Sequence, residues 1–137
     1  MADGVFQQMV NEAGLADVIA VDSCGTGGWH VGEKAHRGTR AILEQHEIPY
    51  DGRSRKVSTA DMADPTTWII AMDASNMRDL KATFGDHPRL HRLLEFSKQY
   101  ADVENVPDPY YSGGFDYVYE LVTDGCTGLL KHVISEP

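Results

Sequence analysis

Cysteine is scarce in this chain of 137 residues. It has only two, Cys24 and Cys126, and they lie far apart in the sequence. A disulfide framework or a cysteine-based metal cluster needs more cysteines at closer spacing, so we expect both thiols to be reduced. The six histidines are scattered, with no pair at metal-ligand spacing beside a carboxylate or a thiolate, and we therefore expect no metal site.

Basic residues are also few relative to acidic ones. The chain has 12 Lys and Arg against 21 Asp and Glu, which gives a formal net charge of −9. Nucleic acids and anionic membranes require clustered Lys and Arg, so we expect neither as a partner. A phosphorylated substrate is repelled at long range, and its site must be made attractive locally by backbone amides or an arginine.

Long apolar runs and targeting segments are missing as well. No run approaches the roughly 18 consecutive apolar residues of a membrane span, and residues 1–13 lack the basic start and apolar block of a signal peptide. We therefore expect a cytoplasmic protein. Its length fits one domain over residues 1–137, and its 42% apolar and 24% charged residues are ordinary for a soluble globular protein.

The spacing of apolar residues predicts alternating helices and strands. Helices are expected at 1–13, at 35–47, from Asp73 or Ser75 to Phe84, and at 115–134, with a short turn capped by Ser58 at 58–64. Strands are expected at 17–23, 66–72 and 92–96, of which the last could also be helical. Loops are expected in the glycine-rich segment 24–34 and in the acidic segment 101–108. This order predicts an α/β fold with a parallel sheet flanked by helices on both faces. The order begins in the middle of a strand–helix–strand unit, because no strand is expected before the first helix.

Polar residues that follow the predicted strands are candidate site residues, because ligands bind beyond the carboxyl ends of parallel strands. Three segments qualify: 23–32, 73–76 and the loop that leads to Asp108. A proline and two tyrosines follow Asp108, and a carboxylate on such a stiff turn suits a general acid acting on a flat substrate. The same motif also forms surface turns whose tyrosines pack on the next helix. Trp29, in the glycine-rich loop, is either a lid over a ligand or a plug over the edge of the core.

Common nucleotide-binding motifs and the serine-nucleophile elbow of hydrolases are absent from the sequence. The segment GTGGWHVG lacks the G-x-G-x-x-G register that leads into a helix, and there is neither a Walker-type P-loop nor a G-x-S-x-G elbow. We therefore expect no cofactor.

Three segments together resemble one protein family. VDSCGTGGWHVGE, IIAMDASNMRDL and VPDPYYSGGFDYVYELVTDGCTGLL, in this order and at these separations, are similar to the low-molecular-weight protein tyrosine phosphatases, and the similarity extends from Met1 to about residue 132. The resemblance implies a phosphotyrosine phosphatase I-like fold and a metal-independent hydrolase. Its expected substrate is a phosphotyrosine protein or a small aryl phosphate.

The resemblance also implies roles for individual residues. Members of the family attack phosphate with a thiolate in a C-x5-R-[ST] loop and form a phosphocysteine, which needs a thiol of lowered pKa. By matching position, Asp108 is the general acid that protonates the departing phenolate. Ser23 matches the serine that supports the phosphate loop. Trp29 and Tyr110 match the aromatic walls of the substrate slot.

Further positions match with lesser roles. Tyr110 and Tyr111 match tyrosines whose phosphorylation is regulatory in some members of the family. Asp73 and Asn76 match a supporting segment at a strand end. Gly52 departs from the pattern, since relatives often carry a histidine there, near the phosphate loop.

The main departure is the missing nucleophile. Neither Cys24 nor Cys126 has an arginine six positions on, because His30 and His132 stand there. We expect the domain to be N-terminally incomplete, without the family's first strand and C-x5-R loop, and the 137-residue chain to be inactive. The first strand lies inside the family's sheet, so its loss would expose strand edges that favour self-association.

Three interpretations of the function remain at this stage. The first is a protein tyrosine phosphatase whose nucleophile lies in a longer form of the protein. The second is a noncatalytic phosphotyrosine-binding or oligomerising module. The third and least favoured is an arsenate reductase on the same scaffold, which needs resolving cysteines near the nucleophile.

Overall fold

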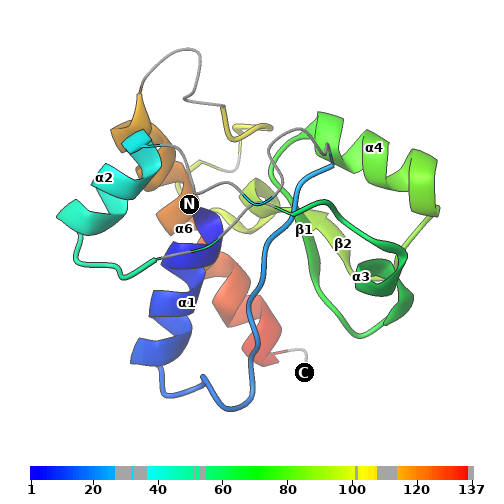
Figure 1. Cartoon of the computed structure of the whole chain (residues 1–137), viewed down its shortest axis with the longest axis horizontal. Coiled ribbons are helices and arrows are strands. Elements are labelled where there is room, and N and C mark those ends of the chain that lie inside the picture. The colour runs from blue at the N-terminus through cyan, green and yellow to red at the C-terminus, as the bar shows by residue number, and fades with distance from the viewer. Residues whose placement is uncertain are drawn as a thin grey trace.

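The computed structural model describes residues 1–26, 32, 37–50, 52, 55–100, 102–107 and 114–135. The elements in this part of the chain are, in order, α1 (Ala2–Glu12), α2 (Arg37–Gln45), α3 (Thr59–Ala63), β1 (Ile69–Ala71), α4 (Ala74–Phe84), β2 (Leu90–Arg92), the 3-10 helix η1 (Leu93–Phe96) and α6 (Phe115–Ser135). Helices α1, α2 and α6 lie on one side of the two strands, and α3 and α4 lie on the other (Figure 1). The predicted α/β class with a sheet flanked by helices is therefore confirmed.

The strands β1 and β2 pair in parallel. Ile69 lies opposite Leu90, and Ala71 lies opposite Arg92. The predicted strand at 66–72 is confirmed in its centre. At 92–96 the strand prediction was wrong and the helical alternative is confirmed, because the strand ends at Arg92 and the 3-10 helix η1 follows.

A side chain explains why the chain turns at Arg92. The carboxylate of Glu95 accepts a hydrogen bond from the backbone N–H of Arg92 at 2.7 Å, which is the geometry of a helix cap. The apolar run LLEF therefore begins a helical turn rather than continuing the strand.

The predicted strand at 17–23 is also wrong. The chain turns at residues 16–18, where the backbone N–H of Val18 donates to the carbonyl of Leu15 at 3.0 Å and the Val18 side chain is 74% exposed. Among the described residues, this region pairs only through one isolated parallel bridge between Gly25 and Lys56. β-Branched residues fit a strand only where a neighbouring strand pairs their backbone groups, and sequence alone does not report that neighbour.

The predicted helices are confirmed, and local signals explain their ends. Helix α1 stops before Gly14, whose φ of +72° is the left-handed conformation that ends helices. Asp73 caps α4 by accepting a hydrogen bond from the backbone N–H of Asn76 at 2.7 Å. At α3, the backbone N–H of Ser58 donates to the carboxylate of Asp61 at 2.7 Å, which completes a capping box.

The core lies where α6 packs against η1 and α1. Leu121, Val122 and Cys126 of α6 are at most 1% exposed, as are Leu93 and Leu94 of η1. The backbones approach closely, since a methyl group added at Gly128 would overlap the carbonyl oxygen of Phe96. The buried stripe on α6 follows the steps of three and four that predicted this helix.

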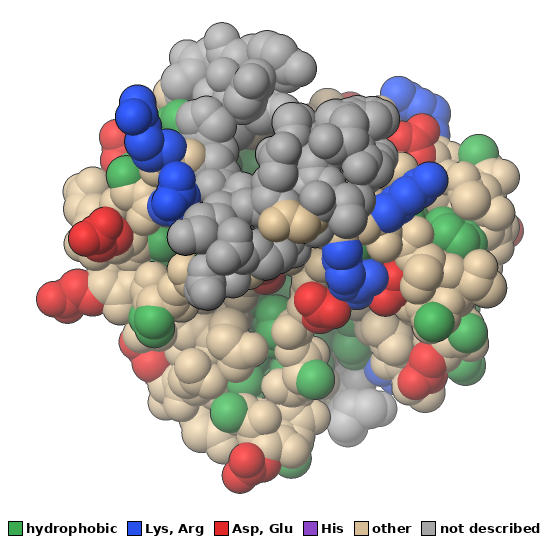
Figure 2. All heavy atoms as spheres, viewed as in Figure 1, with side chains coloured by type: hydrophobic (Ala, Val, Ile, Leu, Met, Phe, Trp, Pro, Cys, Tyr) green, Lys and Arg blue, Asp and Glu red, His purple; other side chains and the backbone are tan. Residues whose placement is uncertain are grey.

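The surface shows how the net charge is distributed. On the face in Figure 2, Asp and Glu side chains are spread around the molecule, while most of the visible Lys and Arg side chains lie in the upper half of the view. None of the helices in the described ranges is both long and apolar enough to cross a bilayer.

Candidate functional site

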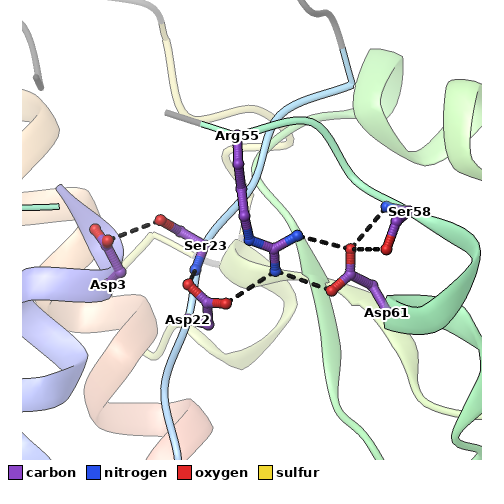
Figure 3. Close-up of polar contacts among 6 residues, drawn as sticks. All are labelled: Asp3, Asp22, Ser23, Arg55, Ser58 and Asp61. Carbon is purple, nitrogen blue, oxygen red and sulfur yellow. Dashed lines mark hydrogen bonds and ion pairs between the residues drawn. The ribbon is translucent and has the colours of Figure 1, made fainter. Parts of the chain in front are cut away.

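A polar network surrounds Ser23, the predicted support of a phosphate loop. Its members come from α1, from the segment before the Gly25 bridge, and from the chain between α2 and the end of α3. We call it the Ser23 network, and it comprises Asp3, Asp22, Ser23, Tyr50, Arg55, Ser58 and Asp61. Figure 3 shows six of these side chains and the bonds between them.

Ser23 is held through the carboxylate of Asp3. The hydroxyl of Ser23 donates to Oδ2 of Asp3 at 2.8 Å, and the phenol of Tyr50 donates to the same oxygen at 2.5 Å. The Asp3 side chain is only 14% exposed, whereas Ser23 is exposed. One shielded carboxylate oxygen in the first turn of α1 therefore accepts two hydroxyl groups from distant parts of the chain.

The electrostatics keep Asp3 ionised and Tyr50 protonated. Although burial opposes it, the amino group of Met1, 3.5 Å away, and the hydroxyls of Tyr50 and Ser23 hold the pKa of Asp3 below its ordinary value. Burial, together with the adjacent Asp3 carboxylate, raises the pKa of Tyr50 above the ordinary phenol value. At neutral pH the pair is thus a charged acceptor and a neutral donor.

Arg55 links the Ser23 segment to α3. Its guanidinium binds Asp61 through two hydrogen bonds of 2.8 and 2.9 Å and binds Asp22 through one of 2.9 Å (Figure 3). The hydrogen bonds from Arg55 hold the pKa of Asp61 well below its ordinary range. Backbone bonds reinforce the link, because the N–H of Gly25 donates to the carbonyl of Arg55 at 2.8 Å.

A second group of predicted residues lies at the carboxyl end of β1. The side chain of Asn76 accepts a hydrogen bond from the backbone N–H of Met72 at 3.3 Å, and the side chain of Asn105 accepts one from Ala74 at 2.8 Å. The N–H of Val106 donates to the carbonyl of Met72 at 3.0 Å. The segment 105–106 that leads towards position 108 is therefore fixed to the end of β1.

A shallow hollow of about 240 Å³ lies at this strand end. The residues that line it are Asp73, Ala74, Ser75, Arg78, Asn105, Val106 and Pro107. The prediction that Asp73 caps the helix is confirmed, and Asn76 holds the end of β1 through the backbone of Met72. The predicted acid Asp108, the predicted slot residues Trp29 and Tyr110, and Tyr111 lie outside the described residues.

Neither cysteine has surroundings that lower the pKa of its thiol. Cys126 is buried in α6, where burial raises the pKa of its thiol to about 12. Cys24 lies at the surface, and partial burial of its thiol raises the pKa despite the nearby positive charge of Arg55. Within the described ranges, no three side chains among His, Cys, Asp and Glu are arranged to hold a metal ion.

The sequence patterns did not point to Asp3, Tyr50 or Arg55. For Asp3 a signal was present, because its neighbours in the first turn, Gly4 and Val5, are apolar, and a carboxylate shielded by such a turn needs polar partners. For Tyr50 no local signal exists, since its partner Asp3 is 47 residues away. For Arg55 only the bonds to Asp61, six residues on, are local, whereas Asp22 is 33 residues away.

Comparisons with known proteins agree on one family. A sequence model described as "Low molecular weight phosphotyrosine protein phosphatase" matches residues 1–136. The chain is 40% identical over 139 residues to the low molecular weight protein-tyrosine-phosphatase YfkJ of Bacillus subtilis, covering 99% of this chain and 88% of the relative. It is 39% identical over 137 residues to the low molecular weight protein-tyrosine-phosphatase PtpA of Staphylococcus epidermidis, covering 99% and 86%.

Solved structures give the same result. The crystal structure of YfkJ has a TM-score of 0.92 at 39% identity and covers 98% of this chain and 86% of that chain. A crystal structure of a protein tyrosine phosphatase from Entamoeba histolytica, with Hepes in its active site, has a TM-score of 0.91 at 26% identity, covering 98% and 87%.

Proposed function

This chain belongs to the low molecular weight phosphotyrosine protein phosphatase family, and from that membership we propose that its function is the hydrolysis of phosphotyrosine in proteins. The observation that carries the proposal is the acid-proline-tyrosine-tyrosine motif at 108–111, which follows a segment fixed by Asn105 and Val106 to the end of β1. A carboxylate that follows a strand-end anchor is well placed to serve as a general acid.

The proposed reaction has two steps. A thiolate attacks phosphorus and forms a phosphocysteine, while Asp108 gives its proton to the phenolate oxygen as the P–O bond breaks. Asp108 then takes a proton from water, which attacks the phosphocysteine, releases inorganic phosphate and restores the thiolate. Trp29 and Tyr110 form the walls of the aromatic slot, and phosphorylation of Tyr110 or Tyr111 regulates it.

In the proposed reaction, neither Cys24 nor Cys126 supplies the attacking thiol. Cys126 is buried with a raised pKa, and the pKa of Cys24 is raised as well. No cysteine in the printed sequence is followed by an arginine six positions later. We therefore propose that the 137-residue polypeptide by itself does not turn over phosphate esters, and that a form preceded by a C-x5-R segment does.

Turnover of p-nitrophenyl phosphate and of a phosphotyrosine peptide tests both the inactivity of the 137-residue polypeptide and the activity of the form preceded by C-x5-R. The 137-residue polypeptide is expected to release no phosphate above the buffer rate, and the form preceded by C-x5-R is expected to be active. In the active form, Asp108→Asn should lower kcat about 10²- to 10⁴-fold. Asp102→Asn is the matched control, because Asp102 is an exposed acid in the same loop and should leave kcat unchanged.

Two outcomes would contradict the proposal. Turnover by the 137-residue polypeptide that disappears in Asp108→Asn would show that the chain does contain a nucleophile. An inactive C-x5-R form that still binds a phosphotyrosine peptide in calorimetry would favour the binding-module alternative. Without a cradle of amides and arginine, the 137-residue polypeptide itself should have little affinity for that peptide.

The remaining alternative and the expected self-association are separate questions. An arsenate reductase needs a second accessible thiol, and the burial of Cys126 argues against it. In the described part of the chain the run at 17–23 forms no strand, and an apolar run without strand pairing supports the expectation of self-association. Sedimentation velocity on the 137-residue polypeptide tests that expectation.

A further inference from the structure

Gly52 leaves a space that the phenol ring of Tyr50 fills. A methyl group built at Gly52 would overlap the Oη and Cζ atoms of Tyr50. Gly52 is not among the described glycines with positive φ, so its backbone conformation does not itself require glycine. The missing side chain at position 52 is therefore explained by the ring that lies there.

The ring reaches the first turn of α1 from the segment that follows α2. On one side it packs against α1, where a methyl group at Gly4 would lie 3.2 Å from Cδ1 of Tyr50. At its end, the hydroxyl donates to Oδ2 of Asp3 at 2.5 Å, the same oxygen that accepts the hydroxyl of Ser23 at 2.8 Å. Tyr50 thus connects the space beside Gly52 with the acceptor of Ser23.

The exposure of Ser23 makes this acceptor important. An exposed serine side chain is not fixed by packing and rotates among its staggered conformers unless a hydrogen bond selects one. Asp3 supplies that bond, and the second donor from Tyr50 restrains the Asp3 carboxylate from rotating away. A carboxylate oxygen has two lone pairs. Because the hydroxyl of Tyr50 occupies one lone-pair direction of Oδ2, the hydroxyl of Ser23 must donate along the other.

We propose that Tyr50 is a positioning residue, which acts through Asp3 to fix the side chain of Ser23, and that Gly52 is the residue that makes room for it. The inference rests on the proposed function, in which Ser23 supports the phosphate loop. Tyr50 touches neither substrate nor nucleophile in this proposal. Its effect on catalysis passes entirely through Asp3 and Ser23.

The first test is Tyr50→Phe in the 137-residue polypeptide, which keeps the ring and removes the donor. Carboxyl ¹³C NMR should show the pKa of Asp3 rising, because one of the bonds that lowers it is lost. The χ1 couplings of Ser23 should change from one dominant conformer towards an average. Tyr117→Phe, at an exposed tyrosine of α6, is the matched control and should change neither. An unaltered Asp3 pKa and unaltered Ser23 couplings in Tyr50→Phe would overturn the proposal.

The second test is Gly52→Ala, which should displace the phenol without altering Tyr50 itself. The Asp3 pKa should rise as in Tyr50→Phe, and the double variant should show no further rise because the same hydrogen bond is already lost. Additive shifts would mean that Gly52 acts on Asp3 by another route, and would overturn the part assigned to Gly52.

The catalytic test uses the form preceded by a C-x5-R segment. Tyr50→Phe should lower kcat/KM for p-nitrophenyl phosphate about 2- to 10-fold, the effect of one hydrogen bond, and should have no effect in a Ser23→Ala background. If wild type is inactive while the Asp3 pKa still responds, the proposed function fails and the hydrogen-bond relay stands. If wild type is active and Tyr50→Phe lowers kcat/KM equally with and without Ser23, the relay fails and the proposed function stands.

Discussion

The α6 core and the Ser23 network contrast in how they are held together. Along α6, Leu121 and Cys126 are at most 1% exposed and touch mainly other apolar side chains. In the Ser23 network, Asp22 and Ser23 are exposed, and hydrogen bonds and ion pairs connect them to distant segments. The core is stabilised by burial, which needs no particular partner, whereas the network depends on specific donors meeting specific acceptors. The two regions should therefore respond differently to substitution, pH and salt.

Leu121→Ala should give the largest effect, because it opens a cavity at a side chain that is 0% exposed. We expect the free energy of unfolding to fall by about 2–5 kcal/mol, measured by urea denaturation. Ile134→Ala on the same helix is the control, since Ile134 is 54% exposed and its loss should cost little. Equal costs at the two positions would mean that α6 is not the centre of the core.

Gly128→Ala tests the close approach of α6 to η1. Alanine favours a helix by about 1 kcal/mol over glycine, yet its methyl group would overlap the carbonyl oxygen of Phe96. We expect a net loss of about 1–3 kcal/mol in the free energy of unfolding. Lys131→Ala, at an exposed position on α6, should be close to neutral. A stabilising Gly128→Ala would refute the close contact.

Arg55→Gln should have a smaller effect, because the ion pairs of Arg55 are partly exposed to solvent. We expect a loss of about 1 kcal/mol in low salt and less at high salt, since screening weakens exposed pairs. Arg92→Gln is the control, because Arg92 donates to the backbone carbonyl of Glu104 and its effect should be less sensitive to salt. A salt-independent cost for Arg55→Gln would contradict its role as an electrostatic link.

The pH dependence of stability should show the smallest effect. The pKa of Asp3 is lowered in the folded state, so its contribution is present above its unfolded pKa of about 3.9 and is lost as pH falls through the folded pKa. Between about pH 5 and pH 2, Asp3→Asn should therefore lose less stability than wild type as pH falls. Thermal denaturation across this range measures it, with exposed Asp102→Asn as the control. Parallel curves for wild type and Asp3→Asn would contradict the lowered pKa.

Sequence reasoning predicted the helical part of the fold well and the strands less well. The apolar spacing at 115–134 predicted α6, and Asp73 and Gly85 marked both ends of α4. The run at 17–23 was predicted as a strand and forms none, whereas the run at 92–96, which the sequence left open between strand and helix, forms a helical turn after Arg92. A strand forms only where another strand pairs with its backbone, and the local sequence does not say where that partner strand lies.

The candidate site divides in the same way. Ser23 was predicted from the resemblance, and the structure places it in a network of charged and hydroxyl groups. The strand-end segment at 73–76 was predicted from the position of its polar residues after a strand, and the structure joins it to Asn105. Asp108, Trp29, Tyr110 and Tyr111 remain predictions.

By itself, the sequence determined the family, the helices and the apolar face of α6, because periodicity and motifs are properties of neighbouring residues. Only the tertiary structure decided which groups share the carboxylate of Asp3. Ser23 is 20 residues away from Asp3 in the chain, and Tyr50 is 47 residues away. Contacts over such separations are set by the packing of whole elements against one another, so no local pattern encodes them.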